Sequence, residues 1–89
     1  MTIERAHTIA KEHMEYSVGT VSYYTMENGK NLHVQTVYEP GYYDDSAMVC
    51  YIDTEDDNGD CMETHTAKHG DIDGIAFWIH ELCYDTEES

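Results

Sequence analysis

The fold class is decided by the stretch Val18-Gly-Thr-Val-Ser-Tyr-Tyr-Thr-Met-Glu-Asn-Gly-Lys-Asn-Leu-His-Val-Gln-Thr-Val-Tyr38. It contains two runs of β-branched and aromatic residues, which are enriched in strands. Between the runs lie Asn28 and Gly29, a pair that tolerates the positive φ angles of a two-residue type I′ turn. The stretch therefore predicts a β-hairpin with strands at Val18–Met26 and Asn31–Tyr38.

A second hairpin is expected further along the chain. Glu39-Pro40-Gly41 should end the second strand, because proline cannot donate to a strand ladder, and residues 42–46 should form a loop. A third strand is expected over Ala47–Asp53, where apolar residues alternate. Asn58-Gly59 should then turn the chain into a fourth strand over Cys61–Ala67.

Amphipathic helices are expected on either side of the strands. Residues at helical spacing over Thr2–Tyr16 form a thin stripe of Ile3, Ala6, His7, Ala10 and Met14. An aspartate is available to cap a second helix, whose apolar stripe is Ile72, Ile75, Ala76, Ile79, Leu82 and Cys83. The sequence predicts one α+β domain over residues 1–84, in which the C-terminal helix packs on a four-stranded antiparallel sheet of two hairpins, and an acidic tail over residues 85–89.

The charge balance is the most unusual feature of the composition. Nineteen Asp and Glu oppose four Lys and Arg in 89 residues, which gives a formal net charge of -15. Internal salt bridges cannot neutralise this excess, and the resulting repulsion destabilises the compact state. The negative electrostatic field of such a protein repels nucleic acid and anionic membranes but speeds association with basic surfaces. Solubility alone is the simpler alternative.

The remaining composition predicts a folded, soluble, cytoplasmic protein. The ten aromatic residues, eight of them Tyr, are too many for a disordered acidic chain. The first residues lack the apolar core of a secretion signal, and no 18-residue apolar run occurs. Three cysteines form an odd set, so we expect free thiols in a reducing compartment.

Two metal-binding alternatives are weaker than the hairpin interpretation. A calcium loop with Gly59 at its sixth position would place Thr54 and His65 at positions that need strong oxygen ligands. Cys61, His65 and His69 could bind zinc, but strand residues four apart lie about 13 Å apart. We therefore expect no metal and no cofactor. We also expect no enzymatic activity, because no Cys-His pair has a recognisable orienting group.

Carboxylates fall into three groups along the chain. DNA spaces its phosphates about 7 Å apart along a strand, a distance that carboxylates on strands or helices can approximate. The candidate partner-binding residues are Asp44, Asp45, Asp53, Glu55, Asp56, Asp57, Asp60, Glu63, Glu81, Asp85, Glu87 and Glu88. Exposed tyrosines would suit the same surface, because Tyr gives large contact area at low entropy cost.

In size, acidity and element order the chain resembles phage-encoded DNA-mimic inhibitors of bacterial defence, the anti-CRISPR and anti-restriction proteins. The resemblance rests on no shared motif, so no residue role is carried over from that class. It implies a phage protein acting in the bacterial host cytoplasm, which binds the basic nucleic-acid-binding surface of a CRISPR effector or restriction enzyme subunit. The alternatives are a non-mimic adaptor or regulatory binding module, and a small zinc-binding protein using Cys61, His65 and His69.

Overall fold

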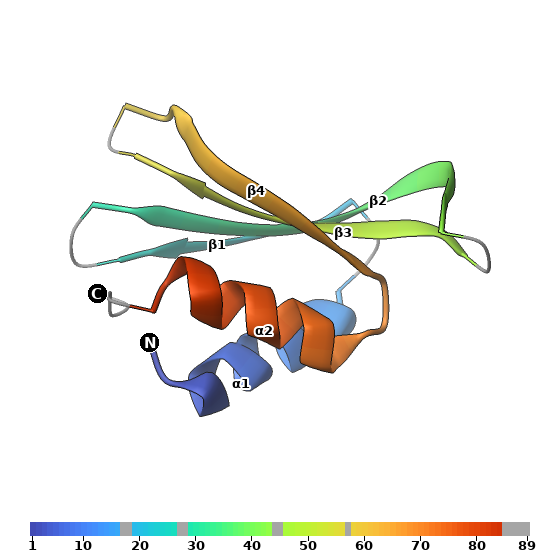
Figure 1. Cartoon of the computed structure of the whole chain (residues 1–89), viewed down its shortest axis with the longest axis horizontal. Helices are drawn as coiled ribbons and strands as arrows, with labels where there is room; N and C mark the ends of the chain where they lie inside the picture. The colour runs from blue at the N-terminus through green and yellow to red at the C-terminus, as the bar shows by residue number, and fades with distance from the viewer. Residues whose placement is uncertain (17–18, 27–28, 44–45, 57, 85–89) are drawn as a thin grey trace.

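The computed structural model of the chain describes residues 1–16, 19–26, 29–43, 46–56 and 58–84. The elements run in the order helix, four strands, helix, which confirms the α+β class (Figure 1). Their bounds are α1 Ile3–Met14, β1 Val21–Thr25, β2 Asn31–Tyr43, β3 Ser46–Glu55, β4 Cys61–Lys68 and α2 Ile72–Leu82.

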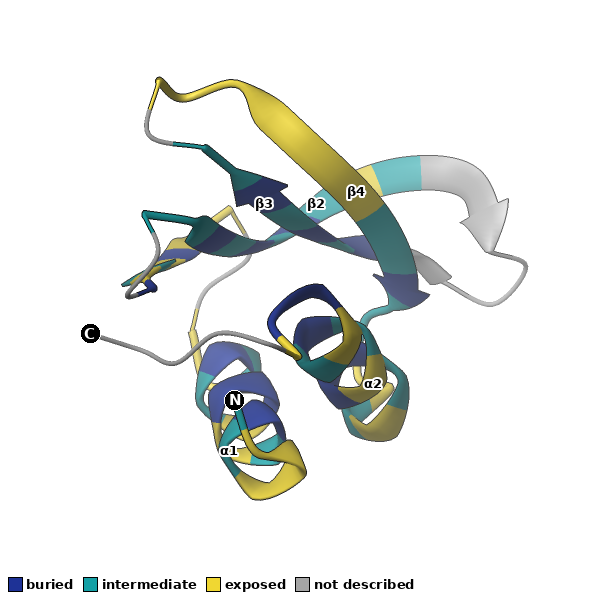
Figure 2. Cartoon of the chain, turned by 60° about the vertical axis from the view of Figure 1, so that its left-hand side comes forward, coloured by how far each residue is buried: buried dark blue, intermediate teal, exposed yellow. Residues whose placement is uncertain are grey.

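The strands form one antiparallel sheet in the order β1-β2-β3-β4, so each strand pairs with its neighbour in sequence. Both helices lie on the same side of this sheet, which gives a two-layer domain (Figures 1 and 2). We call the side that faces the helices the covered face and the other side the open face. Because side chains alternate along a strand, Leu32 and Val34 enter the core from the covered face, and His33 between them lies on the open face.

Both Asn-Gly hairpins form, but with three-residue loops in place of the predicted two-residue turns. The Met26 N–H donates to the Lys30 carbonyl at 2.8 Å, and the Asp56 N–H donates to the Asp60 carbonyl at 3.0 Å. Gly29 and Gly59 have φ angles of 83° and 84°, whereas Asn58 has no positive φ. A single left-handed glycine in a three-residue loop is the next most common hairpin geometry, and it needs no left-handed Asn.

The predicted end of the second strand is wrong. β2 continues through Pro40 and Gly41 to Tyr43, which pairs with Ser46 of β3. The ladder is irregular between Tyr38 and Tyr43, so the proline falls where regular pairing is already interrupted. Proline is tolerated at such irregularities because no regular ladder hydrogen bond is lost.

The predicted core of the second helix is confirmed, and that of the first is partly wrong. Ile75, Ala76, Ile79 and Leu82 of α2 are buried, and the Asp71 carboxylate caps this helix by accepting from the Gly74 N–H at 3.1 Å. In α1 the buried residues are instead Ala6, Ile9, Ala10 and His13. Ile3 is exposed at the first turn, because the helix meets α2 along the row one position away from the predicted stripe.

The three cysteines divide between the core and the surface. Cys50 and Cys83 are buried, whereas Cys61 is exposed on β4 at the edge of the sheet. Its Sγ lies 3.1 Å from the Thr64 hydroxyl. Neither α1 nor α2, the helices of the described ranges, has the length and apolar character needed to cross a membrane.

Candidate partner-binding surface

The candidate surface lies where both Asn-Gly hairpins turn. The pairing of Thr25 with Asn31, of Asn31 with Glu55 and of Glu55 with Cys61 places these two loops at one end of the sheet, which we call the turn end. Six predicted carboxylates at or near this end are described, namely Asp53, Glu55, Asp56, Asp60, Glu63 and Glu81. The other six, Asp44, Asp45, Asp57, Asp85, Glu87 and Glu88, lie outside the described residues.

Three of the six described carboxylates are exposed. Asp60 lies in the β3–β4 loop, Glu63 on β4 and Glu81 in the last turn of α2. Asp56 is less available, because its Oδ1 accepts hydrogen bonds from the backbone N–H groups of Asn58 and Asp60 at 2.9 and 3.0 Å. That carboxylate stabilises the loop that presents Asp60.

The other two carboxylates, Asp53 and Glu55, belong to a half-buried cluster on the open face. The Nδ1 of His33 lies 3.1 Å from Oε1 of Glu55, and both side chains are mostly buried. Asp53 lies directly opposite His33 in the β2–β3 register. Burial raises the pKa of Asp53, His33 counteracts this, and Glu55 raises the pKa further. These two side chains therefore contribute less to an outward acidic surface than the sequence suggested.

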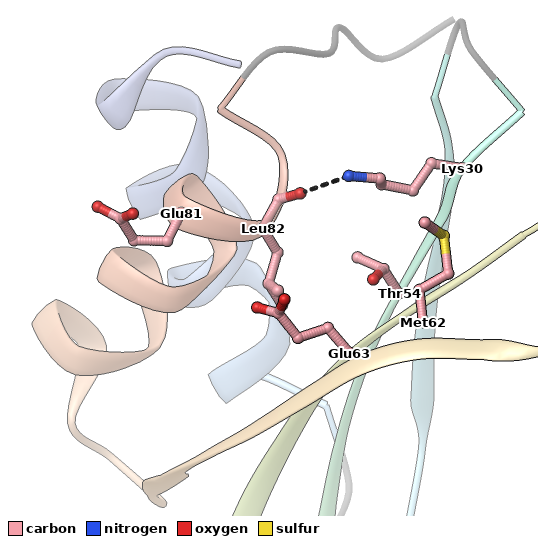
Figure 3. A pocket seen from close by; sticks show the side chains of 6 residues that line it. All are labelled: Lys30, Thr54, Met62, Glu63, Glu81 and Leu82. Carbon is pink, nitrogen blue, oxygen red and sulfur yellow. Dashed lines mark hydrogen bonds between the residues drawn. The ribbon is translucent and has the colours of Figure 1, made fainter.

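A cleft at the turn end is lined by acidic residues from both β4 and α2. It has a volume of about 200 Å³ and is lined by Lys30, Thr54, Met62, Glu63, Glu81 and Leu82. Figure 3 shows the Glu63 carboxylate reaching toward the last turn of α2, whereas the Glu81 carboxylate points to the other side of that helix. The Lys30 ammonium donates to the Leu82 carbonyl at 3.0 Å, as expected for a cation at a helix C-terminus.

The three potential zinc ligands contact three different groups. Cys61 contacts Thr64, the His65 ring stacks on Trp78 at 3.8 Å, and Nδ1 of His69 lies 3.3 Å from the Thr36 hydroxyl. The described residues contain no cluster of three His, Cys, Asp or Glu side chains placed to hold a metal ion.

A buried polar cluster around His13 was missed from the sequence. Its Nδ1 lies 2.8 Å from the Ser22 hydroxyl and its Nε2 lies 3.1 Å from the Thr36 hydroxyl. Burial lowers the pKa of His13, and the neighbouring His69 lowers it further. The spacing of Ala6, Ile9, Ala10 and His13 was the available signal, because it places the imidazole on the buried side of α1. With Ser22, His13 and Thr36 all buried, this cluster joins α1 to the sheet.

The basic side chains divide between the two ends of the sheet. Lys11 is in the last turn of α1, and Lys68 is the last residue of β4, at the end opposite the turn end. The Arg5 guanidinium lies 5.8 Å from the centre of the ring of Tyr24, which pairs with Leu32 near the turn end, and Lys30 caps α2 at that end. The described part of this end thus presents Asp60, Glu63 and Glu81 to a partner.

No family model, curated protein or solved structure matches the chain.

Proposed function

We propose that the protein is an acidic inhibitor that binds the basic nucleic-acid-binding surface of a bacterial defence effector, with a CRISPR effector as the first candidate. It would act in the cytoplasm and block DNA engagement as a DNA mimic. One observation supports this best: Glu63 of β4 and Glu81 of α2, which are separated in sequence, both lie at the turn end, where the Glu63 carboxylate reaches toward the last turn of α2.

The chemistry of the turn end fits a basic partner. A net charge of -15 accelerates encounter with Lys- and Arg-rich surfaces, and the charge density of a phosphate backbone is what such surfaces are built to bind. Asp60 is held by a loop that is itself stabilised by the Asp56 carboxylate. Preorganised acids lose less entropy on binding than acids on a flexible chain.

The experiment begins with affinity purification of a partner from bacterial lysate and continues with a DNA competition titration at two salt concentrations. The protein should displace DNA from the partner, and its affinity should fall steeply as salt rises. Asp60→Lys/Glu63→Lys should weaken competition by about tenfold or more, because each reversal replaces an attraction by a repulsion.

A matched control separates local contacts from net charge. Glu4→Lys/Glu15→Lys changes the charge by the same amount at exposed positions of α1 and its C-cap. This variant should compete nearly as well as the wild type. If DNA and the wild-type protein bind the partner simultaneously, without mutual effect or salt dependence, mimicry is wrong and a non-mimic adaptor takes its place.

A further inference from the structure

The outward side of α2 is aromatic as well as acidic. Phe77 is 49% exposed, and Tyr84, just beyond the helix, is 70% exposed. His80 lies three residues after Phe77, and its ring lies 5.5 Å from that of Tyr84. Glu81 is exposed and lies four residues after Phe77, on the same side of the helix.

This aromatic side continues onto β4. The Trp78 ring lies 5.0 Å from Phe77 in an edge-to-face arrangement and stacks flat on His65, with an interplanar angle of 5°. The Nε2 of His65 in turn lies 2.7 Å from Oε2 of Glu63. We name this surface, made of Glu63, His65, Phe77, Trp78, Glu81 and Tyr84, the α2 aromatic face.

The core of the protein does not require Phe77 and Tyr84 on this face. The opposite side of α2 already buries Ile75, Ile79 and Leu82 against the rest of the domain. Large aromatic side chains gathered in the open, with carboxylates beside them, are typical of binding surfaces. The eleven residues of α2 include no Lys or Arg, so the helix itself supplies no cation to these rings.

We propose that the α2 aromatic face binds an arginine-bearing basic segment of the partner protein. This inference rests on the proposed function in one respect, namely that the partner is basic. A guanidinium group is planar, stacks on aromatic rings and binds a carboxylate through two parallel hydrogen bonds. Phe77 and Tyr84 offer the rings, and Glu81 lies on the same side of α2 between them in sequence. A lysine ammonium makes neither the stacked nor the bidentate contact.

Charge complementarity selects this occupant over others. A second copy of the chain would bring another net charge of -15 to the same surface. Nucleic acid and anionic membranes are repelled for the same reason. The cleft next to this face, at about 200 Å³, is smaller than the roughly 300–1,000 Å³ typical of small-molecule sites.

The test compares two synthetic probes, a nine-residue arginine peptide and a nine-residue lysine peptide, on the full chain. Trp78 is the sole tryptophan, so its fluorescence reports binding at this face directly, and amide NMR shifts locate the contact. The arginine peptide should bind at least fivefold more tightly than the lysine peptide. Phe77→Ala/Tyr84→Ala should weaken arginine-peptide binding about tenfold and change lysine-peptide binding less than twofold.

Two further variants control for folding and position. Phe77→Leu/Tyr84→Leu keeps apolar area but removes the rings, and it should lose the arginine preference even if the alanine variant folds poorly. Tyr16, just after α1, is 48% exposed, which matches the exposure of Phe77. Tyr16→Ala should leave the affinities for both peptides unchanged.

The outcomes separate this inference from the proposed function. Equal binding of both peptides, or shifts located away from residues 77–84, would overturn the arginine-docking inference while leaving a basic partner intact. Failure of both peptides to bind at low salt would overturn both proposals. A dimer in sedimentation that Phe77→Ala/Tyr84→Ala dissolves would assign the face to a second copy and refute arginine docking.

Discussion

Two histidines, His13 of α1 beneath the covered face of the sheet and His33 of β2 on its open face, differ in the partners of their ring nitrogens. Under the covered face, both ring nitrogens of His13 have hydroxyl partners, Ser22 and Thr36. On the open face, His33 contacts Glu55 through Nδ1, while its buried Nε2 and the buried Oδ1 of Asp53 have no hydrogen-bond partner in the described part of the chain. The comparison indicates that stability is concentrated on the covered face, because unpaired buried polar groups cost free energy.

The largest effect on stability should come from the core between the covered face and the helices. Ile79 is fully buried between α2 and the sheet, so Ile79→Ala should lower the free energy of unfolding by about 2–5 kcal/mol. Phe77→Ala on the outward side of the same helix should change it by only about 0.5 kcal/mol or less. Urea denaturation of both variants measures the difference. Equal losses would mean that the outward side of α2 also carries stability.

The His13 cluster should give the next largest effect. His13→Ala leaves the Ser22 and Thr36 hydroxyls without this partner and should cost about 2 kcal/mol at pH 7.5. The pKa of His13 is lowered in the folded state from 6.5, so below pH 6.5 the unfolded chain binds more protons at this residue.

The sign of the pH effect follows from that difference. The wild type should lose stability as pH falls through 6.5 toward the lowered pKa of folded His13, and His13→Ala should lack this part of the slope. Urea midpoints at pH 7.5, 6.5 and 5.5 measure it. Parallel pH profiles for the two proteins would show that His13 does not titrate differently on folding.

Asp53 on the open face should show the opposite sign. Burial raises its pKa from 3.8, so the folded state favours the protonated form and the ionised carboxylate is destabilising at neutral pH. Asp53→Asn should therefore stabilise the protein at pH 7 by about 0.5 kcal/mol. The gain should shrink as pH falls through the raised pKa toward 3.8. A loss of stability at pH 7 would mean that the charge of Asp53 is compensated in the fold.

The smallest effect on stability is expected at the exposed thiol. Cys61→Ser should leave the unfolding transition unchanged, but it should abolish the fast phase of thiol alkylation at pH 8. Buried Cys50, whose pKa burial raises to about 11, and buried Cys83 should react only on unfolding. Fast alkylation that persists in Cys61→Ser would show that the core opens readily.

Local patterns in the sequence predicted the element order well. The Asn-Gly pairs identified both hairpins, and the spacing of Ile75, Ile79 and Leu82 identified the buried side of α2. The stripe on α1 was misplaced because its small and amphipathic residues fit two neighbouring helical rows almost equally well. Pro40 was read as a strand end, since a sequence does not reveal where a ladder is irregular.

The candidate surface was less predictable because it depends on which face each residue occupies. By sequence alone, Asp53 and Asp60 are equivalent acidic candidates. Strand pairing places Asp53 opposite His33, where it is half-buried, whereas the β3–β4 loop leaves Asp60 exposed. The proximity of Glu63 and Glu81 depends on the packing of α2 beside β4, which no local pattern encodes. The same packing places Trp78 on His65.

The order of the strands has a consequence for how the chain acquires its structure during synthesis. Because each strand pairs with its neighbour in sequence, the sheet can form by successive hairpin closures, which are entropically inexpensive. Helix α1 packs chiefly against α2, the last element to be made. We therefore expect α1 to leave the ribosome long before α2. Ile9 and Ala10 should stay exposed to solvent until α2 has been synthesised.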